Sequence, residues 1–242
     1  MNVESYDQII DSWSTDLLRN ECEEMERLNC FENYWLGLND LPTCSVEQYI
    51  LDCFDFYLAD HYPNAVGFEW WTHHFIDDNK MLGFHVDCDE HYRYTTRRIK
   101  TPLLSTVTYL NNHMSPTVIL NVSQSGIIEG ELAPKEPSEV TYSVPGEGKF
   151  MTFNPRYMHG VTVGSANRWT LMYNVWDYKP EQLHRSNYSS SPTSSHFYRC
   201  EGLPPPTYLG QTRCCDINYY DVKCKVSYPI TTDLHDTWLV SQ

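Results

Sequence analysis

The first part of the chain repeats apolar residues with the period of a helix. From Tyr6 to about Asn29, apolar residues recur mostly at intervals of three and four, between acidic positions. This spacing places the apolar side chains on one face and predicts one or two amphipathic helices. A second helix is predicted from Ser45 to about His61, because Ser45 has the side chain of an N-cap residue and Gln48 follows three positions later. We expect residues 1–64 to form a helical support.

The pattern changes at Ala65, where short runs rich in β-branched and aromatic residues are separated by turn signals. Such runs are typical of an antiparallel sandwich or barrel, and eight of them suit a jelly roll. We therefore expect one domain, mainly β with N-terminal helices, whose core spans residues 65–178. The predicted strands are Gly67–Phe75, Leu82–Asp87, Thr101–Asn111, Thr117–Val122, Glu139–Val144, Lys149–Asn154, His159–Val163 and Arg168–Asp177.

The last part of the chain, residues 179–242, is rich in Ser, Tyr and Pro, with Pro204–Pro206 as its clearest run. This composition predicts an irregular extension or a lid instead of a second core. A cysteine cluster near the end lacks the paired Cys-X-X-Cys spacing of a strong zinc motif, so structural zinc is the lesser hypothesis there. Its members are Cys200, Cys214, Cys215 and Cys224.

The net charge of the chain narrows the range of possible binding partners. The chain has 17 Lys and Arg against 32 Asp and Glu, a formal net charge of −15, which repels phosphate backbones and anionic membrane surfaces. We expect no nucleic-acid partner and no membrane partner. A basic stretch runs against this trend and has two open interpretations: it binds an anionic substrate group, or it is a solvated surface strand or loop. It consists of Arg93, Arg97, Arg98 and Lys100.

The N-terminal residues Met1–Ser5 lack a basic region followed by an apolar run, so they do not predict a secretory signal. No stretch is long and apolar enough to predict a transmembrane span. The nine cysteines are then expected to be free thiols in a reducing compartment, cytosolic or nuclear. We expect a cytoplasmic protein.

Three residues in the predicted strands have the chemistry of a metal site. Residues two apart in a strand share a face and lie about 6.6 Å apart, so His85 and Asp87 point the same way. His159 opens another short β run and is the natural third ligand. Two imidazoles and one carboxylate leave open positions on the metal, which is the ligand set of non-heme Fe(II) oxygenases. Asp89 and His91 have the same parity, so a ligand set shifted by two residues stays open.

Arg168 follows nine positions after His159 and opens its own predicted strand. Together with the His-X-Asp strand, this arrangement resembles the 2-oxoglutarate- and Fe(II)-dependent oxygenase superfamily over residues 65–178, and is nearest to its prolyl-hydroxylase-like branch. Four segments carry the resemblance. They are Gly83–Asp87, Ser105–Asn111, Pro145–Pro155 and Arg168–Thr170.

The resemblance implies a double-stranded β-helix, the cupin-like form of the jelly roll, with Fe(II) as cofactor and 2-oxoglutarate as cosubstrate. It assigns Tyr109 and Thr170 to the cosubstrate beside Arg168. A guanidinium suits that role because it meets a carboxylate with two parallel, charge-assisted hydrogen bonds. The implied reaction uses O2 and couples decarboxylation of 2-oxoglutarate to hydroxylation, or a related C–H oxidation, of a small molecule.

Two departures from the family pattern narrow the activity. Met114–Thr117 stands where the prolyl-hydroxylase branch usually has a Gly-Gly pair, which disfavours a peptidyl-proline substrate. The second Arg after Arg168 that is expected of nucleic-acid demethylases is missing, in keeping with the acidic charge. A protein side-chain hydroxylase and a non-redox zinc-binding or sensor β-sandwich are the alternatives, since the same three ligands also suit zinc.

Four residues are candidates for substrate contact, and no catalytic residue is predicted beyond the metal site. Trp71 and His73 precede the metal strand and would supply aromatic walls, although aromatic residues more often pack in a core than line a pocket. Arg97 and Arg156 lie near the metal ligands in sequence. They would form a cationic clamp for a small carboxylated molecule.

Overall fold

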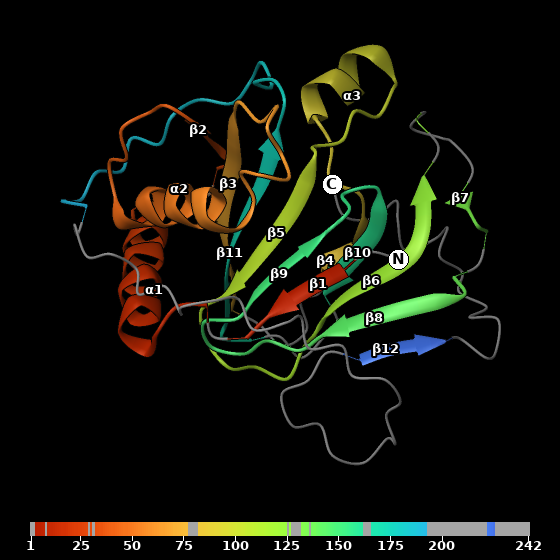
Figure 1. The fold of residues 1–242 in the computed structure, drawn as a ribbon, viewed down its shortest axis with the longest axis horizontal. Helices are drawn as coiled ribbons and strands as arrows, with labels where there is room; N and C mark the ends of the chain where they lie inside the picture. The colour runs from red at the N-terminus through yellow and green to blue at the C-terminus, as the bar shows by residue number, and fades with distance from the viewer. Residues whose placement is uncertain are drawn as a thin grey trace.

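The computed structural model shows two antiparallel sheets that face each other, with two helices against the outer face of one sheet (Figure 1). The structure describes residues 3–7, 9–28, 30, 32–76, 82–124, 126, 132–135, 137–161 and 166–192, and the backbone of 222–225. Within these ranges no helix has the length and apolar character that crossing a membrane requires.

The strands lie in two sheets. The first sheet has the order β1-β9-β5-β11-β3-β2, and the second has the order β12-β8-β6-β10-β4, with β7 paired to β6. The strands of the first sheet are β1 (Val3–Tyr6), β9 (Phe150–Phe153), β5 (Leu104–Tyr109), β11 (Arg168–Trp176), β3 (Gly67–Phe75) and β2 (Tyr34–Gly37). Those of the second are β12 (Val222–Lys225), β8 (Glu139–Ser143), β6 (Thr117–Gln124), β10 (Tyr157–Val161), β4 (Leu82–His85) and β7 (Leu132–Ala133).

The order in which the chain visits the sheets defines the fold. It passes from β3 in the first sheet to β4 in the second, back to β5, across to β6 and β8, back to β9, across to β10 and back to β11. A chain that winds between two facing sheets in this way is a double-stranded β-helix, a form of jelly roll. The predicted fold class is confirmed, and each of the eight predicted strands overlaps one of these eight.

Two strand boundaries near the candidate metal site differ from the prediction. β4 ends at His85, so Asp87 follows the strand instead of lying within it. β10 begins at Tyr157, which places His159 in the middle of the strand and not at its start. Positions 162 and 163, predicted to end that strand, lie outside the described residues.

The basic stretch, for which a solvated strand or loop was one of two interpretations, is helical in its first half. Helix α3 (Glu90–Thr96) begins after Asp89, whose side chain accepts a hydrogen bond from the backbone N–H of Tyr92. It ends at Arg97, whose φ of 59° lies in the left-handed region that often terminates helices. The prediction missed α3 because the helix is short and none of its residues is buried, so no apolar period marks it.

The N-terminal region contains strands as well as the predicted helices. Residues 3–6 pair with β9 as β1, and α1 (Ser12–Arg27) begins after Asp11, whose carboxylate accepts from the backbone N–H of Ser14. Helix α2 (Ser45–Tyr57) begins after Cys44, so Ser45 is its first helical residue and not its N-cap. Glu21 of α1 accepts from the first two backbone N–H groups of α2 and thereby caps the neighbouring helix.

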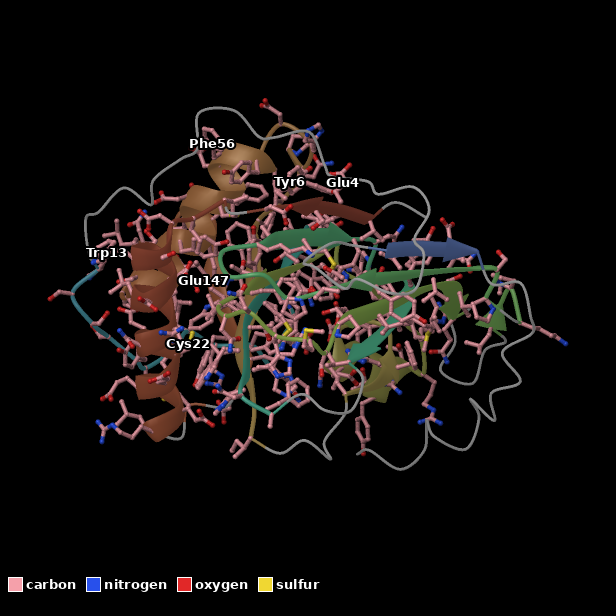
Figure 2. The ribbon with its side chains drawn as sticks, turned by 90° about the horizontal axis from the view of Figure 1, so that it is seen from below. Glu4, Tyr6, Trp13, Cys22, Phe56 and Glu147 are labelled. Carbon is pink, nitrogen blue, oxygen red and sulfur yellow. The ribbon has the colours of Figure 1, made fainter. Side chains whose placement is uncertain are left out.

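The helices cover one face of the first sheet. Cys22 on α1 is fully buried, whereas Trp13 on the same helix is 56% exposed (Figure 2). Side chains of α1 and α2 share one apolar cluster with every second residue of β11, including Trp169 and Leu171. Because successive side chains of a strand point to opposite faces, the residues between them face the space between the sheets.

The segment after β11 returns to the helices and then joins the second sheet. Arg185 forms an ion pair with Glu47 at 2.6 Å, and the backbone N–H of Ser190 donates to the Thr43 carbonyl. The backbone of β12 pairs with β8, so the extension predicted to be irregular supplies a strand. Residues 193–221 and 226–242, with three of the cysteines and the Pro run, lie outside the described residues, as does the Cys224 side chain. The lid and zinc hypotheses concern those residues.

Replacing Leu171 with Ala tests the importance of the interface between β11 and the helices. Leu171 is fully buried, so we expect Leu171→Ala to lower the free energy of unfolding by about 2–5 kcal/mol. Leu41, which is 86% exposed, provides the control, and Leu41→Ala is expected to change it by less than about 0.5 kcal/mol. Urea denaturation measures both. Equal effects would show that the helices do not depend on this face of β11.

Candidate metal and cosubstrate site

The side chains of His85, Asp87 and His159 converge, with one ligand atom of each lying within 4.8 Å of the others. Nε2 of His159 lies 3.6 Å from Oδ1 of Asp87, and Nε2 of His85 lies 3.8 Å from the same oxygen. β10 and β4 are antiparallel neighbours and His159 is the cross-strand partner of His85, so strand pairing brings the two rings together. Atoms bound at about 2.1 Å to one octahedral ion lie about 3 Å apart, so small side-chain rotations would close this set around a metal.

Backbone carbonyls orient both imidazoles. Nδ1 of His85 lies 2.8 Å from the Gly83 carbonyl oxygen, and Nδ1 of His159 lies 3.0 Å from that of Tyr157. A carbonyl oxygen only accepts, so each Nδ1 carries the proton and donates it. A ring that is unprotonated at Nε2 then presents the lone pair of that nitrogen to the site, which is the arrangement found in metal-binding histidines.

Asp87 is held as a carboxylate. Burial disfavours its charge, but the attraction of His159 and His85 and a hydrogen bond from the Ser105 hydroxyl outweigh burial and lower the pKa of Asp87 to about 2. Burial, together with repulsion from His159, lowers the pKa of His85. For His159, burial acts in the same direction, but the charge of Asp87 is stronger and raises the pKa of His159. The cluster therefore offers one anion and two imidazoles.

The alternative ligand set, shifted by two residues to Asp89 or His91, is engaged in other contacts. Asp89 caps helix α3, and its other carboxylate oxygen accepts from the Tyr178 hydroxyl at 2.8 Å. His91 lies 3.2 Å from Glu181. Asp89 is thus held by backbone and a phenol, whereas His85, Asp87 and His159 converge.

Arg168 is 2% exposed and lines the same cavity as the three metal candidates. Its Nε donates to the Ser115 carbonyl at 3.2 Å and its Nη2 to the Thr117 hydroxyl at 2.8 Å. Within the described part of the chain no acidic side chain pairs with it. Burial lowers the pKa of Arg168. A buried guanidinium without a counter-charge is costly, and a bound anion would offset that cost.

The two other predicted cosubstrate residues, Tyr109 and Thr170, are not among the residues that line the cavity. The Tyr109 hydroxyl donates to Thr117 at 2.9 Å, and its ring lies 5.3 Å from the guanidinium carbon of Arg168. The Thr170 hydroxyl lies 3.4 Å from the His73 carbonyl oxygen. Thr117, which the sequence analysis did not single out, lines the cavity between Tyr109 and Arg168. Its position opening a predicted strand gave no signal of this role.

The cavity has a volume of about 560 Å³ and lies between the two sheets. Trp71 and His73 line it, as the sequence analysis expected. Arg97 and Arg156 do not: Arg97 ends α3, and Arg156 is exposed in the turn before β10. Nearness to the ligands in sequence was a poor guide because both residues are exposed and lie in connections between strands.

Two cavity residues that the sequence analysis missed are Glu69 and Asn174. They are cross-strand partners on β3 and β11, and both are buried. The alternation of side chains along β11 was a usable signal for Asn174. Arg168 and Asn174 lie six positions apart, and residues an even number of positions apart in a strand share a face. Ser105, the hydroxyl donor to Asp87, pairs with Asn174 on the other side of β11.

Comparisons with known proteins give matches in structure alone. No protein-family model matches the sequence, and no curated protein matches it. A Pseudomonas putida prolyl-4-hydroxylase is similar with a TM-score of 0.49 and 14% identity, over 73% of this chain and 88% of that one. EctD from S. alaskensis, with 2-oxoglutarate and 5-hydroxyectoine, has a TM-score of 0.48 and 11% identity, over 84% and 81%. The non-heme alpha ketoglutarate dependent epimerase SnoN from nogalamycin biosynthesis has a TM-score of 0.48 and 11% identity, over 86% and 90%.

Gly160→Ala tests how closely β10 must approach β4 for the side chains of the metal candidates to meet. A Cβ at Gly160 would lie 2.6 Å from the Leu82 carbonyl oxygen and 3.2 Å from the Gly83 carbonyl carbon. Because that backbone leads directly to His85, we expect Gly160→Ala to lower the free energy of unfolding by about 1–3 kcal/mol and to weaken metal binding. Urea denaturation and metal titration measure the two effects. Gly146→Ala is the matched control, since its Cβ would meet nothing closer than 3.6 Å; equal behaviour of the two variants would contradict the account.

Proposed function

We propose that this chain is a 2-oxoglutarate- and Fe(II)-dependent oxygenase that hydroxylates a small molecule or oxidises one of its C–H bonds in a related way. The observation that carries the proposal is one cavity lined by two imidazoles, a carboxylate and a buried guanidinium that lacks an acidic partner among the described residues. The first three fit a metal, and the fourth fits an anion. A cosubstrate that binds the metal at one end and carries a carboxylate at the other satisfies both.

The metal role follows from the chemistry of the donors. His85, Asp87 and His159 would hold Fe(II), and bound iron together with 2-oxoglutarate would supply the activation of dioxygen. Gly83 and Tyr157 fix the imidazole rings through their carbonyls, and Ser105 fixes the carboxylate. These contacts matter because partners behind metal ligands set ligand orientation and basicity.

The cosubstrate role falls to Arg168. Its guanidinium has five N–H donors, and the two protein contacts leave donors free for a carboxylate. The Thr117 hydroxyl lies beside it, and the apolar side chains of Val107 and Phe153 line the same cavity. In a cavity of low polarity the ion pair between Arg168 and a carboxylate is stronger than it would be in water.

The same three ligands also suit zinc, so the ligand set does not by itself favour a redox enzyme over a zinc-binding β-sandwich. Arg168 favours the oxygenase over the zinc-binding β-sandwich. A zinc hydrolase or sensor needs no buried cation at the cavity wall, whereas an oxygenase that binds a dicarboxylate cosubstrate does.

Asp87→Asn tests whether the metal is held by Asp87 or, in the shifted ligand set, by Asp89. Loss of residues behind a metal ligand commonly reduces affinity 10- to 100-fold, so removing the charge of a ligand is expected to weaken Fe(II) binding by at least about 100-fold. Asp89→Asn is the control, because Asn also caps helices well and should retain α3. Anaerobic metal titration measures both. Loss of binding in Asp89→Asn alone would establish the shifted ligand set instead.

Arg168→Ala tests the cosubstrate anchor. Anaerobic addition of Fe(II) and 2-oxoglutarate to the wild-type protein is expected to give a weak visible charge-transfer band that neither gives alone. Loss of a buried, bidentate ion pair should weaken 2-oxoglutarate binding by at least about 30-fold in Arg168→Ala, with Fe(II) binding retained.

Arg168→Lys and Arg156→Ala complete that experiment. Lys keeps the charge but not the fork of donors, so its effect should be intermediate. Arg156 is exposed and does not line the cavity, so Arg156→Ala should match the wild type. No band in the wild-type protein would favour the zinc or sensor function.

A further inference from the structure

The proposed metal and cosubstrate roles do not use the part of the cavity around Glu69 and Asn174. These two residues are cross-strand partners on β3 and β11, and both line the cavity. Arg168 is at the other end of the same strand pair, opposite Phe75. Arg168 and Asn174 lie six positions apart on the strand, which corresponds to about 20 Å. The cavity therefore presents a cation at one end of this strand pair and an acid toward the other.

Glu69 is 8% exposed, and its hydrogen-bond partners are all neutral. Its carboxylate accepts from Nδ2 of Asn33 at 2.8 Å, from the Trp176 indole at 3.1 Å and from Nδ2 of Asn174 at 3.4 Å. No Lys or Arg within the described residues pairs with it. Burial, together with repulsion from Asp87, raises the pKa of Glu69 to about 7, although these donors act in the opposite direction. A positive charge beside Glu69 would stabilise its carboxylate.

Asn174 adds a second acceptor that has no partner. Nδ2 of Asn174 donates to Glu69 at 3.4 Å, which directs Oδ1 of the same amide away from that carboxyl group. That oxygen is buried and has no hydrogen-bond partner among the described residues, and Asn174 itself is 2% exposed. An unpaired buried acceptor is costly, and a ligand N–H would satisfy it.

The remaining charges of the cavity have the same sign. Glu26 and Glu90 also line it, and Arg168 is the one Lys or Arg in its wall within the described part of the chain. The net charge of −15 attracts cations to the molecule as a whole. Once Arg168 is assigned to the cosubstrate, the cavity has no cation left for an anionic substrate.

We propose that Glu69 and Asn174 form a substrate subsite that binds a positively charged nitrogen, an ammonium or a guanidinium group. The inference rests on the proposed oxygenase function for its catalytic meaning, because Ser105, the β5 partner of Asn174, donates to Asp87 and so brings the subsite beside the metal candidates. A substrate held there by its charged nitrogen would have a neighbouring carbon on the side of the metal candidates. This replaces the carboxylated substrate expected from Arg97 and Arg156.

The charged group can come from a free metabolite or from a Lys or Arg side chain of a peptide. Free L-arginine, L-lysine and agmatine represent the first source, and N-acetyl-arginine amide and N-acetyl-lysine amide represent the second. N-acetyl-citrulline amide has nearly the shape of the arginine compound but no side-chain charge. Isothermal titration calorimetry measures the binding of each compound, first to the protein alone and then with Mn(II) and 2-oxoglutarate present.

We expect at least one cationic compound to bind, and Glu69→Gln to weaken that binding by about tenfold or more. Asn174→Ala should weaken it as well. Glu181→Gln is the control for loss of one negative charge, since Glu181 does not line the cavity and its side chain is 83% exposed, and it should bind like the wild type. Binding of the free compounds alone, or of the amides alone, identifies the source.

The subsite proposal is overturned if no cationic compound binds, if the citrulline amide binds as well as the arginine amide, or if Glu69→Gln binds like the wild type. The oxygenase function is assessed separately, by the charge-transfer band of Fe(II) and 2-oxoglutarate in Glu69→Gln. A band of wild-type strength with weakened cation binding supports the subsite. Cation binding that depends on Glu69 in a protein without any band would retain the subsite and remove the oxygenase.

Discussion

Every residue of β11 is buried, and the alternation of side chains along this strand divides them between two environments. Leu171 and Tyr173 pack in the apolar cluster with the helices, whereas Arg168 and Asn174 face the cavity. A slip of one residue would exchange the two sets and place a guanidinium in the apolar cluster. The apolar face thereby fixes the register, and the register fixes where the polar groups meet. The N-terminal helices contribute no metal candidate, yet they hold the strand that positions the cavity.

The polar residues of the cavity are poorly satisfied by the protein itself. Arg168 lacks an acidic partner, Glu69 lacks a basic one, and the Asn174 oxygen lacks any donor, all within the described residues. Each of these would destabilise an ordinary core. Buried polar groups without complementary partners are characteristic of functional sites, where the rest of the structure offsets their cost. Here the unpaired groups carry opposite charges, with Arg168 at one end of the β3–β11 pair and Glu69 toward the other. This arrangement suits two different ligands in one cavity.

Strand pattern and spacing predicted the jelly roll, because a half-buried strand has to alternate apolar and polar side chains. Short elements without a buried face, such as α3, left no such pattern, and β1 was missed because its pairing with β9 is far away in sequence. His85 and His159 were found by chemistry and come together because their strands pair. Glu69 was missed because an acid in a strand has no distinctive motif, and its burial depends on Asn33 and Trp176, which are remote in sequence.

The central claim is that this cavity couples an iron centre to 2-oxoglutarate, and aerobic turnover tests it most directly. Protein loaded with Fe(II) and given 2-oxoglutarate is expected to form succinate only when O2 is present, and protein loaded with zinc is expected to form none. Addition of a compound that binds the cavity should increase the rate. Succinate formation that stays at the level of the zinc-loaded protein, with the cationic compounds present as well, would contradict the account.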